Sequence, residues 1–286
     1  MNSIIFHTNT AEQVNAFVII PGHGLLLHGP AGAGKSATAR YLIASMLKRP
    51  LESLDTYPYL LSIDAPEISA KATEVVSQIS HFLSLKVPGD AAVSRFVLVH
   101  DAHALSLTAQ NSLLKLLEEP PASTLLILTA HSPTSVLPTI SSRLQQISVK
   151  RPPLAQVTAF FERAGYDTVS VNRATSISGG LPGLTAGLLS GNAHPLLPAV
   201  EMARELLQNP IYERLILVDK LSKDRQLASD VLFILQQMAH ARLLSTVGSQ
   251  FNRWLKILTA ASEASAKLAA NCQPKLTLDA LMLKLN

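Results

Sequence analysis

Cysteine is nearly absent from this 286-residue sequence, which contains only Cys272. A single thiol excludes an internal disulfide and any zinc site built from several cysteines, and it fits a reducing compartment. No uninterrupted apolar run approaches the roughly 20 residues that a membrane span needs, and the segment MNSIIFHTNT lacks the basic start and apolar core of a secretory signal. We therefore expect a cytoplasmic protein that makes no use of a membrane.

Charged residues are also scarce, at 15% of the chain, with a net charge of +4. Such a small basic excess is compatible with a polyanionic partner but does not indicate one by itself. Hydrophobic residues make up 48% of the chain, which is enough to bury the cores of two or three small domains. The sequence predicts a globular protein whose function has to be sought in its motifs.

The first half of the chain alternates apolar runs with amphipathic segments. Strands are expected within residues 17–28, 59–63, 95–100 and 123–130, and helices within residues 36–49, 67–85 and 106–119. The apolar runs lack polar alternation, which is typical of parallel strands covered by helices on both faces. After Arg151 to Pro153 the pattern becomes helical. We predict an α/β domain over residues 1–150, a small helical domain over residues 151–192 and an all-α domain over residues 193–286.

A glycine-rich segment follows the first expected strand. Gly29, Gly34, Lys35 and Ser36 have the spacing of a phosphate-binding loop: glycine, four residues, glycine, lysine and serine. The glycines let backbone N–H groups close around phosphate oxygens, and the following helix directs its positive end at the same charge. Lys35 would reach the β- and γ-phosphates, and the Ser36 hydroxyl would bind Mg²⁺.

Asp101 ends the buried strand 95–100 and is the carboxylate expected to bind Mg²⁺ together with Ser36. The next residue, Ala102, stands where an ATPase would carry a glutamate that activates water. Loss of a positioned general base costs about 10²- to 10⁴-fold in rate. The sequence therefore predicts that ATP and Mg²⁺ bind but that this chain hydrolyses ATP poorly. The expected binding residues are Gly29, Pro30, Ala31, Gly32, Ala33, Gly34, Lys35, Ser36, Ala37 and Asp101.

A rival interpretation starts from the histidines, because His100, Asp101 and His103 superficially have the spacing of metal ligands. Neighbouring residues of a strand point to opposite faces, however, so His100 and Asp101 should diverge. No second group of ligands follows in the sequence. These two points disfavour a catalytic zinc or iron site.

Residues 100–145, HDAHALSLTAQNSLLKLLEEPPASTLLILTAHSPTSVLPTISSRLQ, resemble the bacterial DNA polymerase III clamp-loader subunits, which are AAA+ ATPases. The matching pieces include the helix ending in EEPP and the segment LPTISSRLQ, which resembles the family's serine-arginine-cysteine motif. With the phosphate loop they cover most of residues 25–150, and NCQPKLTLDALMLKL resembles the family's closing helix. The resemblance implies an AAA+ domain, a helical lid domain and an all-α collar domain that oligomerises.

Within this family the sequence is most like the delta-prime subunit, because DAHAL and SGGLPGLTAGLLSG depart from the motor subunits. Motor subunits carry a phosphate-sensing arginine in the lid, where Leu181, Pro182 and Gly183 stand here. Either Thr129 or His131 replaces the first sensor residue. The relatives' four-cysteine module has no counterpart in residues 48–67, which implies that zinc is absent, and Leu144 replaces the motif cysteine with an effect on packing only.

Arg143 is the residue to which the resemblance assigns chemistry. It implies an arginine finger acting in trans, which contacts the γ-phosphate held by a neighbouring subunit and can contribute about 10³- to 10⁵-fold in rate. The alternative is a surface arginine paired with a local carboxylate.

The resemblance thus implies a delta-prime-like stator that works with gamma/tau motor and delta subunits to load a sliding clamp onto primed DNA. An autonomous gamma/tau-like ATPase motor and a scaffold that binds no nucleotide remain alternatives. Lys71 and Lys86 are candidate DNA contacts, although a solvated lysine is the favoured interpretation of each.

Overall fold

A computed structural model describes residues 4–65, 72–84, 93–191, 194–244 and 246–285. The chain divides into two compact units, Met1–Arg151 and Pro152–Asn286. The predicted lid and collar both fall within the second unit, and their separation into two domains stays a prediction.

The first unit contains a sheet of five parallel strands in the order β2-β3-β4-β1-β5. Leu26 of β1 lies beside Leu128 of β4, and Val97 of β3 lies beside Leu126 of β4. The predicted α/β fold with a covered parallel sheet is confirmed. The strands are β1 Gly24–His28, β2 Leu60–Asp64, β3 Arg95–His100, β4 Thr124–Ala130 and β5 Gln145–Ser148.

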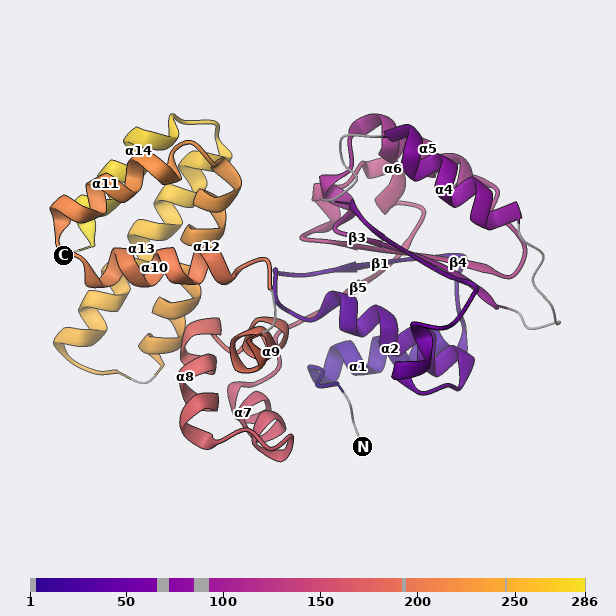
Figure 1. Ribbon diagram of the computed structural model, residues 1–286, viewed down its shortest axis with the longest axis horizontal. Helices are drawn as coiled ribbons and strands as arrows, with labels where there is room; N and C mark the ends of the chain where they lie inside the picture. Colours follow the sequence, from indigo (N-terminus) through magenta and orange to yellow (C-terminus); the bar gives the residue numbers. More distant parts are fainter. Residues whose placement is uncertain (1–3, 66–71, 85–92, 192–193, 245, 286) are drawn as a thin grey trace. The chain divides into compact units, whose positions relative to one another are not determined.

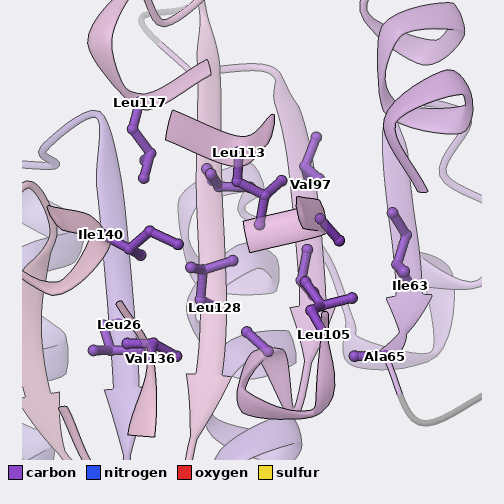
Figure 2. Packing of buried hydrophobic residues seen from close by; sticks show 14 of the residues in the cluster. Leu26, Ile63, Ala65, Val97, Leu105, Leu113, Leu117, Leu128, Val136 and Ile140 are labelled. Atoms are coloured by element: carbon purple, nitrogen blue, oxygen red, sulfur yellow. The ribbon is translucent and has the colours of Figure 1, made fainter. Parts of the chain in front are cut away.

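Helices cover both faces of this sheet (Figure 1). One face carries α1 Thr8–Ile19 and α2 Lys35–Leu47, and the other carries α4 Ala72–Ser84, α5 Leu107–Glu118 and α6 Pro138–Ser141. Figure 2 shows side chains such as Leu113, Leu128 and Ile140 gathered in the layer between the sheet and α5. Because both faces are buried, the three inner strands β1, β3 and β4 are buried along almost their whole length and show no alternation.

Two sequence-based expectations about the sheet need correction. The strand expected within residues 17–28 occupies only β1, because residues 8–19 form α1. Thr10, Val14 and Phe17 of that helix are buried, a spacing of four and three residues that marks one helical face. The strand β5 was not predicted at all, because only Ile147 is fully buried in its short, glutamine-rich sequence.

The segment that lacks the cysteine module is held by other contacts. A short 3₁₀ helix, Leu51–Leu54, buries Leu54. Nη2 of Arg40 lies 2.7 Å from Oδ1 of Asp55, and the Tyr57 hydroxyl donates to the carbonyl of Ser94 at 2.6 Å. Apolar burial and polar anchoring therefore order this segment without a metal-binding cysteine.

The second unit is helical throughout its described residues, as predicted. Its central helix is α12, which packs against α8, α10 and α13. None of the helices in the described ranges is both long and apolar enough to cross a bilayer. The helices are α7 Leu154–Arg163, α8 Thr168–Ser178, α9 Pro182–Ser190, α10 Leu197–Gln208, α11 Ile211–Leu221, α12 Arg225–Leu243, α13 Ser249–Ala269 and α14 Pro274–Lys284.

Leu144, the residue in place of the motif cysteine, is 6% exposed and packs so closely on Gly24 that a Cβ there would lie 2.3 Å from its Cδ2. We expect Leu144→Ala to lower the free energy of unfolding by about 2–5 kcal/mol, because it leaves a cavity under β1. Hydrogen exchange of the β1 and β5 amides during urea titration measures this loss. Leu107→Ala, at an exposed leucine, is the control and should change it by less than about 0.5 kcal/mol. Equal effects of the two variants would refute the packing role.

Candidate functional site

The carboxyl ends of β1, β3 and β4 meet at one edge of the sheet, because the three strands are parallel and β4 lies between the other two. The glycine-rich loop follows β1, Asp101 follows β3 and His131 follows β4. Ligands of open parallel sheets bind outside these ends, near the point where the strand order reverses. The polar residues found at this edge form the candidate site.

The glycine-rich loop adopts a conformation that only glycine fits at two positions. Gly34 has a φ of +93° and precedes the first residue of α2. A Cβ at Gly29 would lie 2.5 Å from the carbonyl oxygen of Val149, which is too close for any side chain. At Gly29 and Gly34 the loop therefore presents backbone without a side chain to the place where phosphate would bind.

Lys35 is 7% exposed and turns back onto its own loop. Its Nζ donates to the carbonyls of Gly29 and Pro30, at 3.1 and 3.2 Å. Burial lowers the pKa of the Lys35 ammonium, and the negative charge of Asp101 opposes this shift. The ammonium is thus satisfied by two carbonyls that a bound phosphate would have to replace.

His100, rather than Asp101, lies against the hydroxyl that was predicted to bind Mg²⁺. Nδ1 of His100 is 2.9 Å from Oγ of Ser36, and Nε2 is 3.0 Å from Oγ of Ser62. Burial lowers the pKa of His100, although Asp64 and Asp101 partly oppose it. A neutral imidazole has one donor and one acceptor, which suits two hydroxyl partners. The Ser36 hydroxyl is therefore hydrogen-bonded to an imidazole nitrogen of His100.

Whereas His100 contacts Ser36, Asp101 follows the last residue of β3 and groups with His103 and His131. Its φ is +46°, a left-handed conformation that aspartate tolerates better than most residues. Its backbone N–H donates to Oγ1 of buried Thr129 at 2.9 Å. Of the two sensor candidates, Thr129 thus serves to position Asp101, whereas His131 lies beside it. The Mg²⁺-binding role of Ser36 and Asp101 stays a prediction.

Ala102 faces the hydrophobic core and is 1% exposed. A glutamate at position 102 would point into that core and away from the site. The lack of a general base therefore does not follow from Ala102 alone. The acidic group whose charge raises the pKa of Lys35 is Asp101. In this geometry His100 and Asp101 stand where the sequence argument had placed Asp101 and Ala102.

Asp101, His103 and His131 come together at the ends of β3 and β4. Each offers one nitrogen or oxygen ligand atom, and these atoms lie within 4.8 Å of one another. The two imidazole rings have centroids 4.0 Å apart. Desolvation, followed by the nearby His103 and Lys35, lowers the pKa of His131 to about 4. Burial also lowers the pKa of His103. This cluster could hold a metal ion.

The sequence argument missed His131 as part of a cluster, although a signal was present. Asp101 and His131 each directly follow a buried apolar strand. Once β3 and β4 are known to be parallel neighbours, both residues must lie at the same edge. The sequence did not reveal the order of the strands, and without that order the cluster could not be predicted.

Arg143 follows α6 and pairs with a carboxylate of α5. Its Nη2 lies 2.9 Å from Oε1 of Glu118, and its Nη1 donates to the carbonyl of Thr139 at 3.0 Å. The side chains of Arg143 and Glu118 are 39% and 52% exposed. The guanidinium is thus accessible, while its local pairing is what the alternative interpretation anticipated.

The remaining predicted positions belong to the second unit or lie outside the described residues. Leu181 and Pro182 are buried at the start of α9, inside the second unit. Lys71 and Lys86, the candidate DNA contacts, lie outside the described residues. The structure therefore unites the loop and Asp101 and leaves the DNA contacts as predictions.

Comparisons with known proteins give consistent similarities. A family model described as DNA polymerase III, delta subunit, matches residues 20–153. The DNA polymerase III delta-prime subunit of Pseudomonas aeruginosa is 32% identical over 209 residues, which are 66% of this chain and 62% of that protein. The tau subunit of Bacillus subtilis is 29% identical over 139 residues, 45% of this chain and 25% of that protein. The matches thus span less than two thirds of either relative.

A solved structure of a DNA polymerase III gamma subunit-related protein from Thermotoga maritima covers 97% of this chain and 98% of its own. It is 17% identical and has a TM-score of 0.48.

The lowered histidine pKa values predict how stability depends on pH. Below the ordinary value of 6.5 the unfolded chain takes up protons that folded His131 resists down to about 4. The free energy of unfolding should therefore fall as the pH drops from about 7 to about 4. Urea unfolding across this range measures the slope. We expect a shallower slope for His131→Gln. Identical slopes for the variant and the natural sequence would contradict this assignment.

Proposed function

We propose that this chain, whose sequence resembles the delta-prime subunits of bacterial DNA polymerase III, is a stator subunit of a clamp loader. The observation that carries the proposal is the contrast between an intact phosphate loop with an impaired metal site and an exposed arginine outside it. A subunit built in this way would contribute more to a neighbour's ATP hydrolysis than to its own.

Nucleotide binding is supported by the loop. The glycines leave room for phosphate, α2 directs its positive end at it, and Lys35 needs only to exchange two carbonyl acceptors for phosphate oxygens. Mg²⁺ prefers oxygen ligands, and here the Ser36 hydroxyl is paired with His100. We propose that ATP and Mg²⁺ bind weakly at this edge and that hydrolysis by this chain is slow.

The arginine finger is supported by the accessibility of Arg143. Its pair with Glu118 is exposed, and exposed ion pairs contribute only about 0–1 kcal/mol. A neighbour's γ-phosphate carries more charge and accepts the same forked hydrogen bonds. We propose that Arg143 leaves Glu118 and contacts that phosphate when the subunits assemble.

The second unit supports assembly. Its described helices expose large apolar side chains, which mark protein contacts when they gather on one surface. We propose that residues 193–286 form the collar, residues 151–192 the lid, and that the partners are gamma/tau and delta subunits, a sliding clamp and primed DNA in the cytoplasm. The exposed side chains on α11, α13 and α14 are Tyr212, Leu215, Ile216, Phe251, Leu255, Leu276 and Leu283.

One observation favours the scaffold alternative, in which no nucleotide binds. Lys35 is already satisfied by loop carbonyls and buried. A fluorescent ATP analogue at millimolar concentration distinguishes the two functions. We expect saturable binding that Lys35→Ala weakens at least about tenfold, because the lysine contacts two phosphates. Absence of binding by the natural sequence would favour the scaffold.

The stator function predicts the behaviour of Arg143→Ala. DNA-stimulated ATP hydrolysis should be measured for gamma/tau motor subunits reconstituted with delta and this chain. We expect the variant to lower the stimulated rate of the site it completes by about 10³- to 10⁵-fold, because transition-state charge loses its cation. This chain alone should show negligible turnover.

Glu118→Gln is the matched control, since it breaks the same ion pair and keeps the arginine. It should leave the stimulated rate unchanged or raise it by up to about fivefold, the equivalent of the exposed pair. If both variants lower the rate equally, Arg143 serves only to hold Glu118 and the finger is refuted.

A further inference from the structure

The cluster of Asp101, His103 and His131 has no part in the trans action of Arg143. It joins residues from two neighbouring strand ends, with ligand atoms within 4.8 Å of one another. Asp101 is fixed through its backbone by Thr129, His103 belongs to the 3₁₀ turn Ala102–Ala104, and His131 directly follows β4. The strand pairing itself therefore holds the three groups together.

An unsatisfied polar atom lies within this cluster. Among the residues that the structure describes, none supplies a hydrogen-bond partner to buried Nδ1 of His103. Buried polar atoms of native proteins nearly always have a partner, and an exception calls for an explanation such as an ion. The His131 ring lies beside that of His103, at a centroid distance of 4.0 Å, and offers a second nitrogen ligand within 4.8 Å of the other two groups.

We propose that Asp101, His103 and His131 bind one divalent transition-metal ion of the Zn²⁺ class. Two imidazoles and one carboxylate suit Zn²⁺, Co²⁺ or Ni²⁺, whereas Mg²⁺ takes oxygen ligands and would find only one carboxylate here. Three protein ligands leave a fourth position for water or a phosphate oxygen. The scarcity of cysteine excludes a cysteine-based zinc module and has no bearing on a site of this composition.

Local geometry permits the required closure. Zinc bonds of about 2.0–2.2 Å place tetrahedral ligand atoms roughly 3.3–3.6 Å apart, so the groups must approach one another from at most 4.8 Å. His131 is exposed and can rotate toward the other two without leaving a core. The positive charge of Lys35 opposes a cation nearby, but its Nζ donates to the Gly29 and Pro30 carbonyls, and Asp101 offsets one charge.

Titration with Co²⁺ tests this site directly. The full chain, without a histidine tag and after treatment with a chelator, is titrated with no nucleotide or partner subunit present. We expect one equivalent of Co²⁺ with the visible absorption of a four-coordinate ion, displacement by Zn²⁺, and no displacement by Mg²⁺ at millimolar concentration. Zn²⁺ should also raise the melting temperature, because the ion binds only the folded cluster.

Variants locate the ion. His103→Ala and His131→Ala should each weaken Co²⁺ binding by more than about 10- to 100-fold. Loss of a residue that only supports a ligand already costs that much, and these variants remove a ligand itself. His23→Ala, at an exposed histidine elsewhere in the unit, should leave Co²⁺ binding unchanged. Circular dichroism confirms that each variant is folded.

Absence of stoichiometric binding, or binding that survives both His103→Ala and His131→Ala, would overturn the site. Loss of binding in His23→Ala with retention in His131→Ala would overturn it as well. Since no ATPase is measured, either result leaves the stator function to be judged separately by Arg143→Ala.

Discussion

The parallel pairing of β4 with β1 on one side and β3 on the other is the constraint on which the site depends. It brings the ends of three strands to one edge, so that residues more than a hundred positions apart in the sequence lie next to each other. The glycine loop, Asp101 and His131 need no contact of their own to meet there. Hydrophobic burial on both faces stabilises the sheet, and the polar groups lie at the carboxyl ends of its inner strands.

Which residue of the β3 end lies beside Ser36 then decides which cation this edge would favour. His100 continues the row of side chains that faces α2, and it reaches Ser36. Asp101, one residue later, turns into a left-handed conformation and joins two imidazoles. A carboxylate beside the serine would favour a hard cation, while an imidazole there occupies the hydroxyl. The polarity of this edge thus differs from an oxygen-lined magnesium site although the phosphate loop is complete.

The sequence predicted the buried strands β3 and β4, the loop and the helix α2 well, because each has a strong local pattern. It failed where the pattern was ambiguous or weak. The apolar run at residues 17–20 suited a strand or a helix equally, and β5 is mostly polar because an edge strand buries less. Side-chain partners were harder still: neither the pair of Arg143 with Glu118 nor the meeting of His103 with His131 has a local signal. Both depend on contacts between elements that only the fold supplies.

The close approach of Gly29 to Val149 links the phosphate loop to the border between the two units. The N–H of Val149 donates to the carbonyl of His28 at 2.7 Å, and the N–H of Gly29 donates to that of Ala130 at 3.2 Å. Val149 lies three residues before Pro152, where the second unit begins. A displacement of the backbone at Val149 would therefore shift Gly29, the first residue of the loop, because no side chain separates the two segments.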